Sequence, residues 1–423
     1  MLLVSFIREN REKVVELLSI KNFKNIEIID NIINLDNKRK ETQKLLDDDL
    51  AESNNLAKEI GNLFKTGKAA EANELKARTA ELKITSKEHG DALEVIEKEL
   101  QDLLYLVPNL PHHSVPRGKT PEDNLTIHQE GEIPKLHANA VPHWDLTTKY
   151  NIIDFELGNK ITGAGFPVYK GKGAKLQRAL INFFLDNALN AGYTEIQPPL
   201  MINEASGYGT GQLPDKEGQM YHVGIDNLFL IPTAEVPVTN LYRDMILKSD
   251  EFPIKNAAYS QCFRREAGSY GKDVRGLNRL HQFDKVEIVQ IQHPDKSYET
   301  LEQMRDYVSG LLRLLELPFR VLKLCGGDMS FASALTYDME VFSVAQERWL
   351  EVSSVSNFES FQANRMKLRY KDADGKTRLA HTLNGSALAL PRIVAALLEN
   401  NQTEEGIRIP KALVPYTGFE MIN

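Results

Sequence analysis

The chain has 423 residues, more than a single hydrophobic core usually serves, so we expect at least two domains. Its apolar fraction of 42% and charged fraction of 26% are typical of a folded soluble protein and argue against a disordered, fibrous or membrane chain. The formal net charge of -8 excludes a general attraction for polyanions, so any contact with nucleic acid must come from local basic groups.

The cysteines and the apolar segments further limit the class of protein that this chain can be. Cys262 and Cys325 lie far apart without a C-x-x-C partner, so we expect neither a disulfide framework nor a zinc site, and a reducing, cytoplasmic location. The apolar start from Met1 to Ile7 lacks a basic flank and is followed by charged residues, which favours a folded domain over a secretion signal. No apolar run approaches the roughly 20 residues of a membrane span, so no membrane partner is expected.

The first predicted element is a pair of long helices. Apolar or neutral residues recur at steps of four and three, which is the pattern of a narrow helical seam. The seam positions are Ile28, Ile32, Leu35, Arg39, Thr42, Leu46, Leu56, Ile60 and Leu63, then, after a break at Lys65 to Lys68, Leu75, Thr79, Leu82, Ser86, His89, Leu93, Ile96, Leu100 and Leu103. This predicts an antiparallel coiled-coil hairpin over residues 28–103, with arms of roughly 38 residues and about 57 Å each. Such a hairpin is either a dimerisation or spacer coil or a device that reaches a distant part of a large ligand.

A proline-rich linker follows the hairpin. Pro108, Pro111 and Pro116 cannot continue a helix interior, so we place a domain boundary here, with a helical arm over residues 1–107 and a second domain over 108–423. Beyond the linker, short extended runs alternate with turns and helices, among them a helix from Leu176 to Leu189. The runs are 192–198, 257–263, 279–290 and 378–383. The fold class predicted is α+β, with helices flanking an antiparallel sheet.

The second domain contains no standard nucleotide loop but does contain a strand–loop–strand segment rich in arginine. The glycine needed for a Walker sequence before Gly118 is absent, and no G-x-G-x-x-G follows a strand. Instead, Arg264 ends a predicted strand, a polar loop with Gly268, Gly271 and Gly276 follows, and the next strand carries Phe283. An arginine grips carboxylate or phosphate with two parallel hydrogen bonds, and an aromatic ring stacks on a base. A surface salt-bridge hairpin is the alternative for Arg-Arg-Glu alone, but the length of the whole segment disfavours it.

This segment resembles motif 2 of the class II aminoacyl-tRNA synthetases. "EAGSYG", "RGLNRLHQF" and "DKVEIVQ" are similar to the version in the seryl-tRNA synthetases. Three further marks of that family are present: "TAE" at 233–235, "EVSSVSN" at 351–357, and "HTLNGS" at 381–386 leading to Arg392. Pro198-Pro199 after the predicted helix resembles motif 1, the dimer element. The likeness covers essentially the whole chain, including the hairpin, which in that family holds the long variable arm of the tRNA.

The resemblance implies a two-step reaction. Serine and ATP give seryl-adenylate, and the seryl group then passes to the 3′ end of tRNA(Ser), with tRNA(Sec) as a further acceptor; the enzyme is expected to be a homodimer. A carboxylate with a pKa near 3.5 is already ionised at pH 7, so the first step needs no general base, and positioning and charge stabilisation remain for the protein. Arginines should therefore dominate the site.

The resemblance also implies residue roles. Arg264 bridges the serine carboxylate and the α-phosphate, Arg392 holds the γ-phosphate, and Glu287 accepts from the serine ammonium and hydroxyl. The catalytic set is Arg264, Glu266 and Arg392. The serine pocket is Thr233, Ala234, Glu235, Arg264, Glu287, Asn384 and Ser386. The ATP site is Arg264, Arg265, Glu266, Arg279, Phe283, Glu351, Val352, Ser353, Ser354 and Arg392, with Glu351 and Ser354 as Mg²⁺ ligands, since Mg²⁺ prefers oxygen.

Histidines and two competing classes complete the sequence-based hypotheses. His112, His113 and His143 with Trp144 are interpreted as structural, and His281, two residues from Phe283, is expected on the same face without a catalytic role. A related ligase that charges a carrier protein should lack the hairpin. A non-catalytic tRNA-binding relative should have lost Arg264, Glu266, Glu351 or Arg392. The chain has the hairpin and all four residues, which disfavours both.

Overall fold

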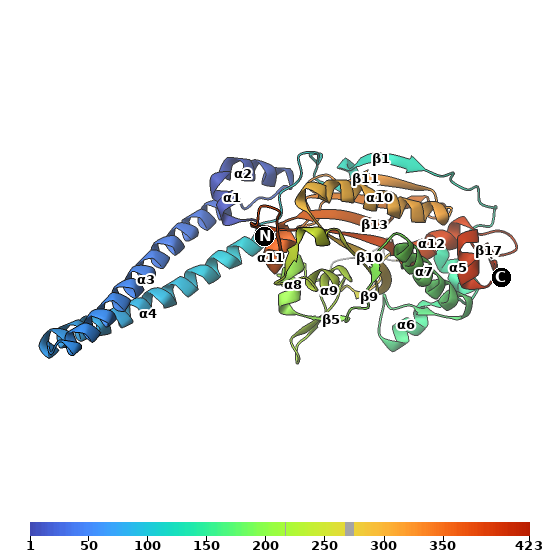
Figure 1. The fold of residues 1–423 in the computed structure, drawn as a ribbon. Coiled ribbons are helices and arrows are strands. Elements are labelled where there is room, and N and C mark those ends of the chain that lie inside the picture. Colours follow the sequence, from blue (N-terminus) through green and yellow to red (C-terminus); the bar gives the residue numbers. More distant parts are fainter. Residues whose placement is uncertain (216, 267–274) are drawn as a thin grey trace. The chain divides into compact units, whose positions relative to one another are not determined.

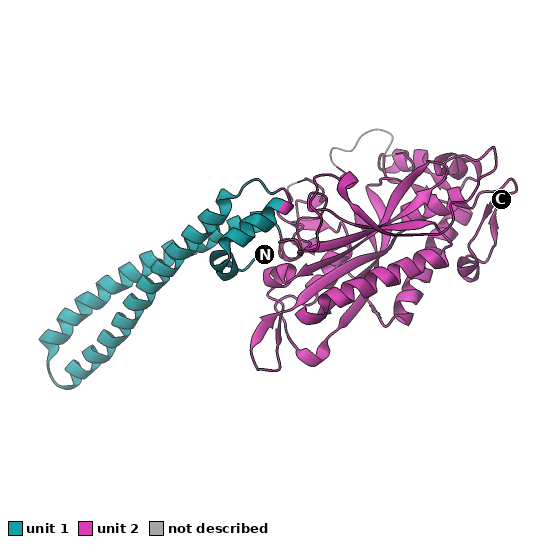
Figure 2. Ribbon diagram, turned by 90° about the horizontal axis from the view of Figure 1, so that it is seen from above, with its two compact units in different colours: residues 1–19, 23–108 teal, residues 20–22, 109–423 magenta. Residues whose placement is uncertain are grey.

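The computed structural model describes residues 1–215, 217–266 and 275–423. The chain forms two compact units (Figure 2), the first made of residues 1–19 and 23–108 and the second of residues 20–22 and 109–423. In the described parts of the chain, no helix combines the length and the apolar character needed to cross a membrane.

The first unit is helical, and its long helices lie side by side (Figure 1). It contains α1 (Val4–Glu9), α2 (Arg11–Ile20), α3 (Glu27–Lys65) and α4 (Ala69–Leu106). The predicted seam is where α3 meets α4: Ile28, Ile32, Leu82, Leu93 and Leu100 are buried. At 1.5 Å per residue each long helix spans about 57 Å. The predicted coiled-coil hairpin is therefore confirmed.

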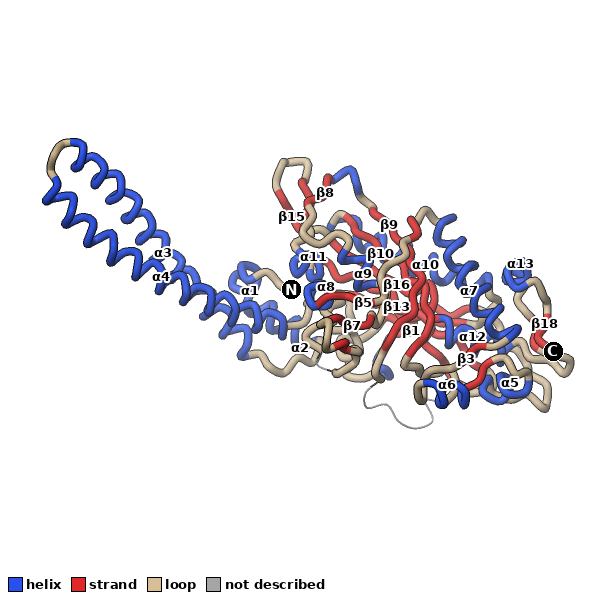
Figure 3. The backbone as a smooth tube through the Cα atoms, turned by 90° about the horizontal axis from the view of Figure 1, so that it is seen from below, coloured by secondary structure: helices blue, strands red, loops and turns tan. Residues whose placement is uncertain are grey.

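The second unit is organised around one large sheet (Figure 3), in which the described residues form eight strands. Its order is β1-β11-β12-β13-β16-β10-β9-β4, antiparallel throughout except for β4 beside β9. The strands are β1 (Leu125–Glu130), β4 (Thr194–Glu195), β9 (Ile254–Phe263), β10 (Gln282–Gln292), β11 (Phe319–Lys323), β12 (Leu335–Ser343), β13 (Arg348–Glu359) and β16 (His381–Ala389). The α+β class and the flanked antiparallel sheet are confirmed.

The two faces of the sheet have different roles, because side chains alternate along each strand. On β10, Val286 and Ile288 enter the main core, where three helices cover the sheet: α7 (Gly171–Asn190), α10 (Ser297–Leu314) and α12 (Leu390–Asn400). Val289 and Ile291 enter a second, smaller core on the other face. That face also carries the odd-numbered residues at the start of β10, and it holds the candidate site.

Short elements build the walls around the second face. They include α8 (Glu204–Thr210), α9 (Glu235–Asn240), α11 (Phe361–Met366), β5 (Met201–Asn203), β6 (His222–Val223), β7 (Leu228–Leu230), β8 (Ile246–Lys248), β14 (Arg369–Lys371) and β15 (Thr377–Leu379). The remaining elements are α5 (His143–Lys149), β2 (Ile153–Asp154), α6 (Phe155–Ile161), β3 (Val168–Tyr169), β17 (Ile407–Arg408), α13 (Val414–Thr417) and β18 (Met421–Ile422).

The boundaries of several predicted elements differ from those observed. Only β4 forms within the expected extended run 192–198, and the run 378–383 is divided between β15 and β16. The expected helix at 176–189 begins five residues earlier, at Gly171. Pro391 lies in the first turn of α12, where its missing N–H has no intrahelical partner to lose, so it fits the helix start.

Candidate active site

Arg264 and Phe283 meet at the mouth of the strand–loop–strand segment. Arg264 directly follows β9. Phe283 is the second residue of β10 and pairs with Cys262 of β9. The Arg264 guanidinium carbon lies 5.2 Å from the centroid of the Phe283 ring, and its Nε donates to the Pro232 carbonyl at 3.3 Å. The structure therefore brings together the two groups expected to hold a carboxylate or phosphate and a base.

Arg279 and Glu266 form an ion pair. Arg279 Nη1 lies 3.1 Å from Glu266 Oε2, across a segment whose residues 267–274, Gly268 and Gly271 included, lie outside the described residues. Glu266 has a φ of 48°, in the left-handed region that non-glycine residues seldom occupy and that is common at functional sites. Its neighbour Arg265 is exposed and uses its backbone N–H to reach the Gln219 carbonyl at 2.8 Å.

Two buried carboxylates and one buried lysine lie deeper on the same face. Glu235, at the start of α9, and Glu287, on β10, are 6% and 2% exposed. Lys285 Nζ lies 2.6 Å from Glu287 Oε2 and donates to Thr233 Oγ1 at 2.9 Å. The Ser386 hydroxyl, directly across the ladder from Glu287, donates to the same Oε2 at 3.5 Å. Together these groups form a small, strongly polar pocket.

Burial, and then the charge of Glu287, raises the pKa of Glu235 to about 7. Hydrogen bonds from Gln362 and Asn384 and the charge of Lys285 act in the opposite direction. The Gln362 amide donates to Glu235 Oε1 at 2.7 Å and is itself oriented by the Thr382 hydroxyl, which donates to Gln362 Oε1 at 2.6 Å. The pocket can therefore exchange a proton near neutral pH and receive a small cation.

Glu351 and Ser354 reach one face of β13 through a bulge. Residues three apart in a regular strand point to opposite faces. Here Ser354 pairs with Asp338 and Glu351 with Glu340, so the ladder skips Val352 and both side chains share the face of Asp338 and Glu340. Because of the bulge, the two motif residues, although three apart in sequence, point to the same face of the sheet.

The two residues between them face inward. Val352 and Ser353 are 1% and 2% exposed, and the Ser353 hydroxyl donates to the Ser386 carbonyl at 2.6 Å. This bond ties β13 to the strand that carries the serine-pocket candidates. Their side chains are therefore turned away from the open face, and only their backbone groups are available to a nucleotide.

Acidic side chains and the Ser354 hydroxyl lie together at the bulge. Burial, and then the charge of Glu351, raises the pKa of Asp338 well above its usual range, while a hydrogen bond from Ser354 opposes the shift. The buried Asp338 Oδ1 has no hydrogen-bond partner. Such an oxygen-rich, electron-rich site suits a hard divalent cation. Within the described ranges, no cluster of three or more His, Cys, Asp or Glu side chains could hold a metal alone, so a bound phosphate would have to complete the ligand set.

Arg392 connects this bulge to the strand–loop–strand segment. Its Nη1 donates to the Glu351 carbonyl at 2.7 Å and lies 3.7 Å from Glu351 Oε2, while its Nε donates to the Asn278 carbonyl at 3.0 Å. It extends from the first turn of α12. All the proposed catalytic arginines thus belong to one continuous region of the second unit.

Three residues of this region were not predicted from the sequence. Lys285 had a usable signal, because it is a charge two residues before Glu287 in a predicted strand and so shares its face. Gln362 and Asp338 gave none, since their positions depend on tertiary packing. His281 precedes β10, stacks on Phe166 with ring centroids 5.6 Å apart, and lies 2.9 Å from the Tyr221 hydroxyl.

Comparisons with known proteins agree with this geometry. Residues 1–111 match the seryl-tRNA synthetase N-terminal domain, and residues 221–401 match the tRNA synthetase class II core domain (G, H, P, S and T). The serine–tRNA ligase of Salinibacter ruber is 49% identical, over 100% of this chain and 99% of that protein. The serine–tRNA ligase of Chlorobaculum parvum is 46% identical over the full length of both chains.

A solved structure extends the agreement to three dimensions. The seryl-tRNA synthetase of Pyrococcus horikoshii, complexed with ATP, superposes with a TM-score of 0.92 at 34% identity, covering 100% of this chain and 99% of that one. Sequence, fold and site geometry therefore lead to the same assignment. The chain belongs to the seryl-tRNA synthetase family.

Proposed function

We propose that this protein activates serine with ATP and transfers the seryl group to tRNA(Ser). The observation that carries the proposal is the arrangement on one sheet face, where Arg264 and Phe283 lie beside the buried pocket of Glu235, Lys285 and Glu287. A nucleotide and an amino acid would meet at Arg264. The two relatives that match this chain over its full length are named serine–tRNA ligases, which supports the same activity.

Adenylate formation in this site relies on positioning. The serine carboxylate is ionised at neutral pH, so it attacks the α-phosphorus without a base, and the protein must align the two anions and stabilise the added charge. In our proposal Arg264 contacts the carboxylate and the α-phosphate together, and Phe283 stacks on adenine. Arg279, Glu266 and Arg265 line the adenine end, and Arg392 holds the terminal phosphate.

Serine selectivity comes from the buried acids. An ammonium group fits between Glu235 and Glu287, and the serine hydroxyl can donate to a carboxylate oxygen. Thr233, Ala234, Asn384 and Ser386 form the remaining wall. Alanine leaves the oxygen that accepts from the serine hydroxyl without this partner and is rejected for that reason, whereas threonine is rejected by its extra methyl group.

Magnesium fits the bulge on β13. Glu351 and Ser354 would hold it, with the Asp338 carboxyl group across the ladder from Ser354 and ATP phosphates completing the ligand set. When bound, Mg²⁺ lessens the repulsion between the phosphates and the incoming carboxylate. The chain's own contribution is to hold Glu351 through its carbonyl bond to Arg392.

The helical arm would hold tRNA. Basic groups on its surface include Lys38, Arg39, Lys40, Lys76, Arg78 and Lys83. Arg78 is paired with Glu52 at 2.9 Å, and Arg39 with Asp36 at 3.0 Å, whereas Lys38 and Lys83 are exposed. We therefore assign phosphate contacts first to Lys38 and Lys83. Such contacts suit a double-helical RNA arm, whose deep major groove hides its base edges.

A homodimer in the cytoplasm, with tRNA(Sec) as a second acceptor, completes the proposal. The apolar side chains of α7 that precede the Pro198-Pro199 turn, Leu176, Leu180 and Phe184 among them, are buried inside the unit itself and cannot form the dimer contact. Leu189, Leu200 and Met201, next to the Pro198-Pro199 turn, are exposed and take their place. Light scattering at micromolar concentration tests the dimer, and a monomer mass contradicts it.

Free thiols at Cys262 and Cys325 support a reducing compartment.

The decisive experiment is ATP–pyrophosphate exchange with each of the twenty amino acids. We expect exchange with serine alone, since only serine fills the buried acceptors without a clash. Exchange with another amino acid would change the assigned substrate. A complete lack of exchange by the folded protein would remove the proposed activity.

A further inference from the structure

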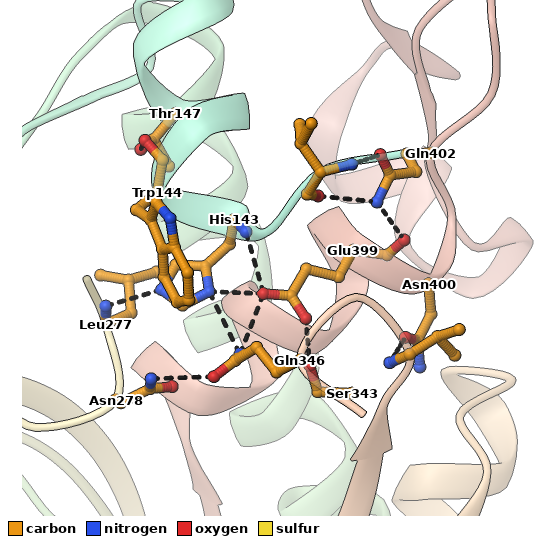
Figure 4. Close-up of polar contacts among 12 residues, drawn as sticks. His143, Trp144, Thr147, Leu277, Asn278, Ser343, Gln346, Glu399, Asn400 and Gln402 are labelled. Carbon is orange, nitrogen blue, oxygen red and sulfur yellow. Dashed lines mark hydrogen bonds and ion pairs between the residues drawn. The ribbon is translucent and has the colours of Figure 1, made fainter. Parts of the chain in front are cut away.

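His143, Glu399, Gln346 and Ser343 form a polar cluster with Leu277 and Asn278 (Figure 4). His143 begins α5 and Glu399 lies in the last turn of α12, and both side chains are fully buried. His143 Nδ1 lies 2.6 Å from Glu399 Oε1. A buried charge is costly unless it is fully hydrogen-bonded, so this pair requires an explanation.

The hydrogen bonds define the tautomer of the His143 imidazole. The Leu277 backbone N–H, which can only donate, points to His143 Nε2 at 2.8 Å. Nε2 is therefore the acceptor, and Nδ1 carries the proton that is donated to Glu399. Glu399 also accepts from the His143 backbone N–H at 2.9 Å, from Gln346 Nε2 at 2.9 Å and from the Ser343 hydroxyl. The two oxygen atoms of Glu399 thus accept from four donors.

The cluster holds one short piece of chain, residues 275–278. Besides the Leu277 bond, Asn278 Nδ2 donates to Gln346 Oε1 at 2.9 Å, and the Arg275 guanidinium carbon lies 4.7 Å from the Trp144 ring centroid. Gly276 has a φ of 66°, and a Cβ there would lie 2.2 Å from His143 Nε2. The backbone thus approaches the imidazole so closely that only glycine fits.

This piece of chain leads directly into the ATP-binding candidates. Arg279 follows it and pairs with Glu266, and the Asn278 carbonyl accepts from Arg392 Nε at 3.0 Å. Arg392 and Glu399 are seven residues apart on α12, so they lie on the same side of that helix, two turns apart. Helix α12 therefore holds residues 275–278 at two points. Arg392 bonds them directly, and Glu399 acts through His143 and Gln346.

We propose that His143 is a positioning residue for ATP, because its Nε2 holds the Leu277 N–H and thereby sets the place of Arg279 and Arg392. Glu399 and Gln346 act with it by orienting the imidazole and the Asn278 side chain. The proposal rests on the function proposed above. It assigns His143 more than the structural role expected from the sequence.

Two substitutions separate positioning from simple support. In His143→Asn the amide nitrogen can replace Nδ1 and keep Glu399 satisfied, but nothing reaches Leu277. In His143→Gln the longer side chain can present an oxygen near Nε2 and keep the Leu277 bond, but the donor to Glu399 is lost. A role confined to packing α5 against α12 predicts that Gln is the more harmful change, whereas positioning predicts that Asn is.

The measurement is serine-dependent ATP–pyrophosphate exchange by the full-length protein. We expect His143→Asn to raise the KM for ATP by about 10-fold, because a small displacement of an aligning group is enough for such a loss, with the KM for serine unchanged. His143→Gln should stay within about 2-fold of wild type. Equal effects of the two variants, a larger effect of Gln, or an unchanged KM for ATP in His143→Asn would overturn the proposal.

A second pair decides the matter if the histidine variants do not fold. Gln346→Met removes the bond to Asn278. Gln402→Met is the matched control, since Gln402 is buried and bonds Val141 on the same side of the unit but does not contact residues 275–278. Only Gln346→Met should raise the KM for ATP, and equal values for the two would refute the inference. If wild type itself lacks serine-dependent exchange, the proposed function fails instead.

Discussion

The helical arm and the sheet of the second unit bury different kinds of side chain. Where α3 meets α4, the buried positions are mostly aliphatic and follow a steady repeat, as at Ile32, Leu82 and Leu93. The centre of the sheet instead buries two carboxylates and a lysine within one pocket, at Glu235, Lys285 and Glu287. An aliphatic seam is stabilised in proportion to the apolar area that it buries, so each residue contributes a small part of the free energy of folding. A buried charge is stable only with its particular partners, so the loss of one partner strongly destabilises the fold.

This difference predicts that the arm and the sheet are functionally separable. Replacing residues Asn31 to Glu99 by a short Gly/Ser link should lower aminoacylation of tRNA(Ser) by about 10³-fold or more, because the phosphate contacts that carry much of RNA affinity are lost. Serine-dependent pyrophosphate exchange should stay close to wild type, since no residue proposed to bind serine or ATP lies in the arm. Full charging by the armless protein would contradict the proposed role of the arm.

The reverse experiment damages the sheet and spares the arm. Arg264→Ala should slow serine-dependent pyrophosphate exchange by on the order of 10²-fold or more, because one preorganised donor to the transition state is removed. Binding of tRNA(Ser), measured in a filter or fluorescence assay, should be unchanged.

Arg264→Lys is the matched control for this loss. It keeps the charge but not the paired donors, so exchange should recover only partly. Exchange by Arg264→Ala at the wild-type rate would remove Arg264 from the proposed mechanism.

The same difference explains which features could be predicted from sequence. The hairpin was accessible because a heptad repeat is local, and the arms end close to the predicted residues. Arg264, Phe283 and Glu287 were accessible through a family resemblance and through alternation along one strand. Which of these residues bind substrate remains a prediction until the experiments above are done.

Other features depend on tertiary structure and have no local signal. The bulge that brings Glu351 and Ser354 to one face arises from pairing with β12, and Gln362 reaches Glu235 from a helix 127 residues away in sequence. The positioning role proposed for His143 likewise has no local signal. A histidine beside a tryptophan is typical of packing, and its contact with Leu277 spans 134 residues.

Glu235 should make the stability of the second unit depend on pH. Its folded pKa is about 7 against an ordinary 4.5, so the folded state binds the proton more tightly than the unfolded state does. Stability from this group is therefore fully present below pH 4.5 and is lost as the pH rises through 7. Glu235→Gln removes that loss and should be more stable than wild type at pH 8 by at most about 3 kcal/mol, with little difference at pH 4.5.

Denaturant unfolding of the two proteins at both pH values measures the effect. The exposed Glu156→Gln on α6 is the control and should show no such pH-dependent gain. Serine binding by Glu235→Gln should weaken, since the pocket loses a carboxylate. A Glu235→Gln variant that is equally stable relative to wild type at both pH values would show that the raised pKa does not operate.

The smallest effect should come from the seam of the arm. Thr79 lies at a half-buried seam position of α4 and uses its hydroxyl only to bond the Leu75 carbonyl one turn earlier. Thr79→Leu adds apolar area to the seam and replaces a β-branched residue with a better helix former, so it should stabilise the arm by about 1 kcal/mol. Hydrogen exchange of the α4 amides in the full-length protein should slow accordingly, with pyrophosphate exchange unchanged. Glu74→Leu, on the exposed side of the same helix, should give only the small propensity gain. If both leucines slow amide exchange equally, helix propensity rather than the seam determines the stability of the arm, and the contrast between an aliphatic seam and a charged pocket loses its physical basis there.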